Sequence, residues 1–168
     1  MPIYIALLRA VNVGGTGKLS MPALKSMCLE AGFRDVETYI ASGNAVFHAN
    51  ASASKVKTEL EAKLLAYAGK PVGVHVRTAD EMKAILDRNP FSKHPTNFTV
   101  AIFLDERPPS DALNHATGKA DEEMHLGERE IYVHYGAGMG RSKLKIPAAK
   151  YGTARNMNTV AKLVAMAS

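Results

Sequence analysis

The chain has 168 residues, a net charge of +5 and a pI near 9.3. Its hydrophobic fraction of 46% and charged fraction of 22% are typical of a globular protein and exclude a disordered or collagen-like chain. The single cysteine, Cys28, excludes an internal disulfide and a cysteine-rich zinc site. The N-terminus has no basic leader, and its apolar run over residues 3–8 is too short to span a membrane. We therefore expect a cytoplasmic protein with no membrane partner.

Acidic residues are absent from both ends of the chain. None precedes Glu30 and none follows Glu130. The net charge of +5 consequently divides into +2 over residues 1–20, −3 over 21–130 and +6 over 131–168. This pattern predicts an electropositive surface built from both ends, provided that the ends meet in the fold. The alternative is that short basic termini serve solubility alone.

The first half of the chain alternates strand-like and helix-like patterns. Ser20 can cap a helix from Met21, Gly32 can end it, and Gly69 can end the next one. The expected order is strand, helix, strand, strand, helix and strand, over residues 3–11, 21–31, 36–41, 45–48, 54–68 and 72–77. Such a β-α-β-β-α-β order is typical of a ferredoxin-like unit, an antiparallel sheet with two helices on one face.

The second half shows a similar order. Thr78 and Glu81 form a capping box for a helix that ends at Asn89. A strand, a short helix, two strands and a final helix are then expected, over residues 98–104, 109–117, 123–126, 130–135 and from 158. The stretch before the last helix reads as weakly structured. The sequence thus predicts an α+β fold with two subdomains, 1–78 and 79–168, packed as one compact unit. We interpret the second as a related or degenerate ferredoxin-like half, although many α+β chains show similar patterns.

Three segments combine glycine, basic and amide residues. Residues 12–18, NVGGTGK, link a strand to a helix but lack the Walker spacing, because position 12 is Asn and position 19 is Leu. Residues 135–143, YGAGMGRSK, offer mostly hydrogen-bond donors without a Rossmann context. Residues 153–162, TARNMNTVAK, place Arg and Asn at a helix start, where anions bind readily. Each segment also has an explanation without a ligand. Residues 12–18 could form only a tight turn, residues 135–143 a basic loop, and residues 153–162 an ordinary helix cap.

Residues 8–15 (LRAVNVGG), 39–44 (YIASGN) and 153–163 (TARNMNTVAKL) together resemble domain-of-unknown-function family 1697. The triplets at 89–91 (NPF) and 142–144 (SKL) fit as well, and the resemblance spans essentially the whole chain. It implies a small bacterial protein of α+β fold with no assigned activity. The usual pattern Thr-Arg-Asn-Trp-Asn is altered here, with Ala154 before Arg155 and Met157 in place of Trp.

These observations predict a site for an anionic, phosphorylated ligand, either a nucleotide or a nucleic acid backbone. The chain has 11 aromatic residues and no Trp, which slightly favours a small ligand over single-stranded nucleic acid. The candidate ligand-binding residues are Arg9, Asn12, Gly14, Gly15, Lys18, Ser42, Asn44, Ser142, Lys143, Thr153, Arg155, Asn156, Asn158 and Lys162. The six histidines lack metal-ligand spacing, so no metal is expected; catalytic residues and cofactors are not assigned.

Two other hypotheses stay open. The protein could be an enzyme acting on such a ligand, which requires a carboxylate or histidine, such as His134 or Glu37, within hydrogen-bond reach of Ser42, Asn44 or Asn156. It could also be an interaction module without catalysis, forming a homodimer through a sheet edge or an apolar helix face.

Overall fold

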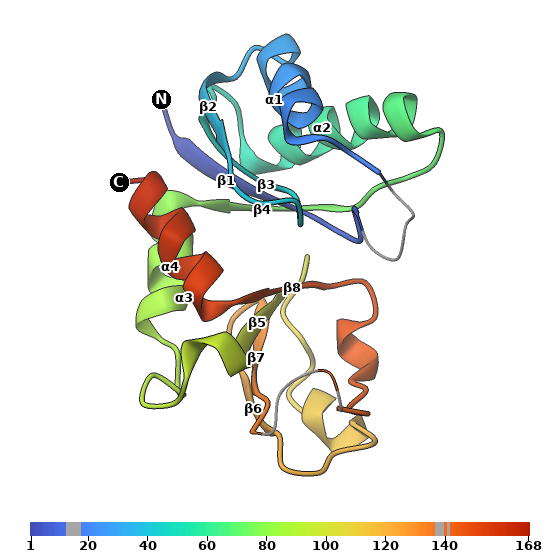
Figure 1. Ribbon diagram of the computed structural model, residues 1–168, viewed down its shortest axis with the longest axis vertical. Coiled ribbons are helices and arrows are strands. Elements are labelled where there is room, and N and C mark those ends of the chain that lie inside the picture. The colour runs from blue at the N-terminus through green and yellow to red at the C-terminus, as the bar shows by residue number, and fades with distance from the viewer. Residues whose placement is uncertain (13–17, 137–139, 141) are drawn as a thin grey trace. The chain divides into compact units, whose positions relative to one another are not determined.

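The computed structural model describes residues 1–12, 18–136, 140 and 142–168 of a mixed α+β protein. These residues form two four-stranded antiparallel sheets, each in its own compact unit (Figure 1). Unit 1 comprises residues 1–84 and 163–168, and unit 2 comprises residues 85–162. Among the described residues, no helix has both the length and the apolar character needed to cross a membrane.

Unit 1 has the element order that the sequence predicts. Its strands and helices are β1 (Ile3–Leu8), α1 (Met21–Glu30), β2 (Arg34–Thr38), β3 (Asn44–His48), α2 (Ala53–Ala68) and β4 (Val74–Thr78). The sheet has the order β2-β3-β1-β4, and every neighbouring pair is antiparallel. Helices α1 and α2 cover one face of this sheet (Figure 1).

The helices of unit 1 begin and end at the residues that the sequence indicates. The Ser20 hydroxyl accepts the Ala23 amide at the start of α1, and the Ser52 hydroxyl accepts the Lys55 amide at the start of α2. Gly69 ends α2 in the left-handed conformation, with φ of 73°. A residue with a Cβ would be strained there, so glycine is favoured.

The core of unit 1 lies between the sheet and its two helices. Tyr4, Ala6 and Leu8 alternate along β1 and point toward this cluster, where Phe33 and Phe47 stack with ring centroids 4.5 Å apart. From α1, the cluster receives the i, i+3, i+4 stripe of Leu24, Met27 and Cys28. Cys28 is therefore a core residue, as its spacing predicts. Burial raises the pKa of its thiol to about 12, so it is protonated at neutral pH.

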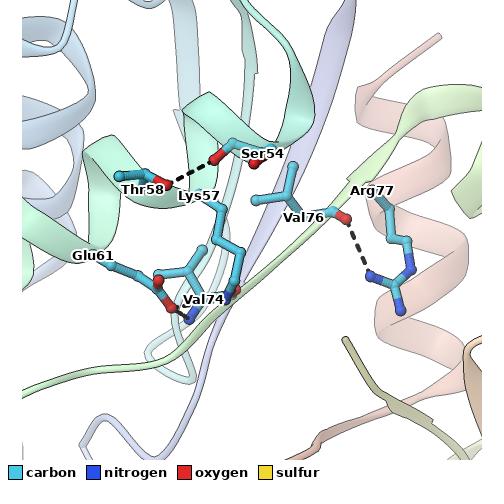
Figure 2. A network of polar contacts seen from close by, with 7 residues as sticks. All are labelled: Ser54, Lys57, Thr58, Glu61, Val74, Val76 and Arg77. Atoms are coloured by element: carbon cyan, nitrogen blue, oxygen red, sulfur yellow. Dashed lines mark hydrogen bonds and ion pairs between the residues drawn. The ribbon is translucent and has the colours of Figure 1, made fainter. Parts of the chain in front are cut away.

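Two side chains of α2 satisfy the backbone at the start of edge strand β4 (Figure 2). The Lys57 ammonium donates to the Val74 carbonyl at 2.7 Å, and the Val74 amide donates to the Glu61 carboxylate at 3.1 Å. Lys57 and Glu61 also pair with each other at 2.8 Å. Helix and strand are thus joined by a closed polar ring in addition to apolar packing.

Unit 2 repeats the strand order of unit 1. Its strands are β5 (Thr99–Phe103), β6 (Glu123–Leu126), β7 (Glu130–His134) and β8 (Thr153–Asn156), arranged β6-β7-β5-β8 and all antiparallel. Helix α3 (Ala79–Asp87) precedes these strands, and α4 (Met157–Met166) follows them. The remaining turns are the 3-10 helices η1 (Thr96–Phe98), η2 (Ala112–His115) and η4 (Pro147–Ala149). The capping box of Thr78 and Glu81 forms as expected.

Two sequence-based expectations for unit 2 are wrong. The short helix predicted over 109–117 is only the 3-10 turn η2, whose backbone hydrogen bonds run from residue i+3 to residue i, as from the Asn114 amide to the Asp111 carbonyl. The weakly structured stretch before the last helix contains strand β8, which pairs with β5 from Val100 to Phe103. Thr153 and Arg155 are buried while Ala154 is exposed, the alternation of a strand.

Candidate anion-binding residues

In unit 1, Asn12 ties two loops together. Its side-chain amide donates to the carbonyls of Leu19 and Ala41, both at 2.8 Å, and its carbonyl accepts the Leu19 amide at 2.9 Å. The ends of the glycine-rich segment are therefore joined to each other and to the loop that precedes Ser42. All of these contacts are made with backbone, so the side chain already has a structural role.

The motif Ser42-Gly43-Asn44 is equally engaged. The fully buried Asn44 side chain donates to the Tyr39 carbonyl at 2.8 Å and to the Ser42 hydroxyl at 3.0 Å. Gly43 has φ of 91°, and a Cβ there would lie 2.8 Å from Val11 Cγ2 and 2.9 Å from Leu8 Cβ. Only glycine fits at this approach between the hairpin and the end of β1.

Backbone strain gathers around these two motifs. Ala10, Asn12 and Ile40 adopt φ of 55°, 55° and 50°, values that non-glycine residues rarely take. For Ile40 the conformation is particularly unfavourable, since the residue is β-branched, and its side chain is 47% exposed. Strained residues cluster at binding sites in many proteins. The strained residues thus lie at the junction that Asn12, Ser42 and Asn44 hold together by hydrogen bonds.

The other predicted residues of unit 1 are Arg9 and Lys18, together with two glycines. Arg9 is half-buried, and its backbone amide donates to the Gly73 carbonyl at 2.9 Å. Lys18 is exposed. Gly14 and Gly15 lie outside the described residues.

In unit 2, Ser142 is held by the buried carboxylate of Glu122. The Ser142 hydroxyl donates to Glu122 at 2.6 Å and accepts the Leu144 amide at 3.2 Å. The Ala120 amide also donates to Glu122, at 2.7 Å. The pKa of Glu122 is lowered, chiefly by the Ser142 hydrogen bond and then by backbone amides. The charged carboxylate therefore anchors this segment, and Ser142 has a partner that the sequence patterns do not indicate.

The Lys143 side chain is exposed, and its backbone lies close to that of Gly118. A Cβ at Gly118 would lie 2.1 Å from the Lys143 carbonyl oxygen, and Gly118 has φ of 72°. Nearby, Thr117 and Lys145 exchange backbone hydrogen bonds of 2.9 and 2.8 Å. These contacts orient residues 143–145 against the loop of 117–118.

Arg155 is buried within its own strand region. Its guanidinium donates to the Thr153 hydroxyl at 2.8 Å and to the Ala154 carbonyl at 3.0 Å. Burial lowers the pKa of Arg155 to about 10, so it still carries a charge at neutral pH. Its exposed fraction is only 7%, and that of Thr153 is the same. An anion can reach this arginine only if the strand region opens.

The asparagines at the start of α4 form caps and bridges. Asn156, rather than Asn158 or Thr159, caps the helix by accepting the Thr159 amide at 2.9 Å. The helix therefore begins at Met157, one residue before the predicted start at 158 and directly after strand β8. Asn158 accepts the Thr96 hydroxyl at 2.5 Å, and Lys162 is exposed.

His134 is the histidine nearest to these segments in the sequence. It is 7% exposed, and its Nδ1 lies 2.9 Å from the Thr99 hydroxyl oxygen. Thr99 donates its own hydrogen to the Pro95 carbonyl at 3.1 Å, so we assign the imidazole hydrogen to Nδ1. The ring stacks on His94 with centroids 4.3 Å apart. Asn156 accepts the Thr159 amide, Asn44 donates to the Tyr39 carbonyl and to the Ser42 hydroxyl, and a carboxylate contact is made by Ser142, with Glu122.

Sequence patterns did not single out a basic pocket in unit 2. It has a volume of about 490 Å³ and is lined by Ile102, Tyr135, Leu144, Lys145, Pro147 and Lys150, among others. None of its described lining residues is acidic. Lys145 and Lys150 are exposed, whereas burial, followed by the charge of Glu122, raises the pKa of the Tyr135 phenol. The acid-free segment 131–168 was the signal that could have identified these lysines.

The structure therefore divides the predicted residues between the two units. Asn12 is joined to the loop of Ser42 and Asn44 in unit 1, and Thr153 contacts Arg155 in unit 2. Within the described residues, no group of three or more His, Cys, Asp or Glu side chains is arranged to hold a metal ion.

Comparisons with known proteins identify a family and a shared fold. The model of a protein family of unknown function, DUF1697, matches residues 1–132. A solved structure described as a conserved bacterial protein from Streptococcus pneumoniae is similar with a TM-score of 0.82 and 24% sequence identity. The similarity covers 99% of each chain, and at this identity it shows a shared fold. No curated protein matches the sequence.

Proposed function

The chain belongs to the DUF1697 family, and from that premise we propose that it binds an anionic, phosphorylated small ligand through the basic pocket of unit 2. This pocket is the main support for the proposal. It is large enough for a small ligand, two lysines and a tyrosine phenol line it, and none of its described lining residues is acidic. Phosphate is the common metabolite group that such a donor set recognises.

The electrostatics of the pocket support the proposal. Two ammonium groups attract a dianion without competition from a carboxylate in the described wall. The raised pKa of Tyr135 keeps its hydroxyl protonated and able to donate a hydrogen bond. The charge of Glu122 affects Tyr135, but the carboxylate accepts hydrogen bonds from Ser142 and Ala120. Its negative charge is thereby stabilised inside the protein rather than directed at a ligand.

Of the ligand-binding residues predicted from the sequence, some lie near the basic pocket in the chain and others belong to unit 1. Lys143 and Ser142 lie next to the pocket residue Leu144 in the chain, and Lys143 would add positive charge. The anion-binding roles of Arg9, Asn12, Lys18, Ser42 and Asn44, which belong to unit 1, stay separate predictions. A homodimer and a cytoplasmic location also stay predictions.

We also infer that both units are ferredoxin-like halves related by duplication. The orders β2-β3-β1-β4 and β6-β7-β5-β8 correspond strand for strand, which supports this relationship. In unit 2, η2 stands between β5 and β6, where unit 1 has α1, and η4 stands before β8, where unit 1 has α2. The turn η4 lines part of the basic pocket, through Pro147 and Ala149.

Calorimetric titration with inorganic pyrophosphate at low salt tests the proposed function. We expect saturable binding to the wild-type protein that weakens with added salt, because exposed charges are screened. Lys145→Gln should weaken binding about tenfold, as expected when one charge-assisted contact is lost. Lys93→Gln, which removes an exposed lysine of unit 2 that is not part of the pocket, is the matched control and should bind like wild type. Equal affinities of both variants for pyrophosphate would contradict the proposal.

A further inference from the structure

A second pocket of unit 2 lies directly beside the basic pocket. It has a volume of about 580 Å³ and is lined by Leu104, Pro108, Asp111, His115, Pro147 and Tyr151, among others. We call it the Tyr151 pocket. Pro147 lines both pockets, so the turn η4 forms their common wall.

Consecutive residues of the chain line the two pockets. Ala149 and Lys150 line the basic pocket, whereas Tyr151 and Gly152 line the Tyr151 pocket. A Cβ at Gly152 would lie 2.9 Å from both Ile102 Cγ2 and Leu104 Cδ2, and these two side chains line different pockets. The pockets are thus separated by little more than one backbone segment.

The two pockets differ in charge. The Tyr151 pocket is lined by three carboxylates, Asp105, Glu106 and Asp111, together with a single arginine, Arg107, and the Asp111 carboxylate lies 3.2 Å from His115 Nε2. Carboxylates repel a second phosphate but accept hydrogen bonds from hydroxyl and amino groups. The Tyr151 side chain is 72% exposed, with the Lys150 ammonium 5.4 Å from its ring centroid. An exposed tyrosine ring beside proline walls suits a planar group that stacks.

From this arrangement we propose that the ligand is a nucleoside monophosphate that spans both pockets, with its phosphate in the basic pocket and its sugar and base in the Tyr151 pocket. This inference rests on the proposed function and specifies the ligand class of the same site. One anionic end and one end rich in hydroxyl and amino donors match the charges of the two walls. The planar base matches Tyr151. Aspartate and glutamate commonly accept the ribose hydroxyls of bound nucleotides.

Titration with a graded set of probes tests the spanning ligand. Adenosine monophosphate should bind more tightly than ribose 5-phosphate, and ribose 5-phosphate more tightly than inorganic phosphate. Tyr151→Ala should weaken adenosine monophosphate about tenfold and leave inorganic phosphate unchanged, because stacking involves only the base. Tyr151→Phe retains the ring and should bind the nucleotide like wild type. Unchanged thermal unfolding of both variants would show that they remain folded.

The outcomes separate this inference from the proposed function. In one outcome, inorganic phosphate binds, Lys145→Gln weakens its binding, and adenosine monophosphate binds no more tightly than inorganic phosphate. The proposed function of the basic pocket is then supported, and the proposal of a spanning ligand is wrong. If adenosine monophosphate binds with sensitivity to Tyr151→Ala but not to Lys145→Gln, the phosphate position is wrong and both proposals fall. If none of the phosphate probes binds, both proposals also fall.

Discussion

The motifs that contain Asn12 and Asn44 can be found in the sequence, but the hydrogen bonds that these two side chains make cannot be predicted from it. Both stood out as polar residues in loops that could bind an anion. In the structure, their amides hold backbone carbonyls and a hydroxyl, and no local pattern in the sequence reveals partners such as Ala41, 29 positions away. Sequence reasoning identifies the residue type and the loop, but long-range partners depend on how β1 and the hairpin are brought together.

Asn12→Ala should lower the free energy of unfolding by about 1–2 kcal/mol. It removes three hydrogen bonds to backbone and places alanine at φ of 55°, which asparagine tolerates better. Urea unfolding followed by circular dichroism measures the effect. Asn50→Ala replaces an exposed asparagine of the same unit and should be close to neutral. Equal stability of the two variants would show that the Asn12 contacts contribute nothing net.

Glu122 should make stability depend on pH in the acid range. Its folded pKa is lowered from 4.5 by Ser142 and backbone amides, so its contribution is present above about 4.5 and is lost as the pH falls through the folded value. Ser142→Ala removes the largest cause of the shift. The variant should therefore be less stable than wild type at pH 7, and the difference should shrink as the pH falls below 4.5. Thermal unfolding of both proteins across this range gives the comparison, and a constant difference would contradict the assignment.

Among the elements, those with strong local signals were predicted best. Ser20 and Gly32 placed α1, and Gly69 placed the end of α2, within a residue or so of the observed ends; the cap at Ser52 is a finding of the structure. Strand β8 was missed because its four residues, TARN, are polar and lie beside a helix. Its pairing with β5, about fifty positions earlier in the chain, supplies the stability that its own sequence lacks.

The ring of Lys57, Glu61 and Val74 should stabilise the contact between α2 and β4. Glu61→Ala removes the acceptor of the Val74 amide and the ion-pair partner of Lys57. We expect a loss of about 1–2 kcal/mol in unfolding free energy, because the Val74 amide loses its side-chain acceptor and Lys57 loses its ion-pair partner, and both side chains are only partly exposed. Glu59→Ala, on the same helix, is the matched control. Hydrogen exchange at the Val74 amide should accelerate in the first variant alone.

For the whole molecule, the sequence predicted the class of fold and the region of the candidate site better than the site itself. The absence of acids after Glu130 pointed to the segment that contains Lys145 and Lys150. It could not indicate a pocket, because the pocket walls come from β5, Thr117 and η4 as well. Conversely, Arg155 looked like an anion ligand by charge, yet only 7% of it is exposed in the folded chain. Charge patterns locate a surface, whereas burial depends on the tertiary fold.

The lone cysteine has a practical consequence for studies of this two-unit protein. Cys28 belongs to the core of unit 1, and unit 2 contains no cysteine. With a thiol pKa of about 12 in the folded state, reagents that require a thiolate are nearly inert toward it. The rate at which Cys28 is alkylated therefore measures how often unit 1 opens. Unit 2 contains no cysteine and contributes nothing to this rate. The native chain thus carries its own site-specific reporter, without an engineered label.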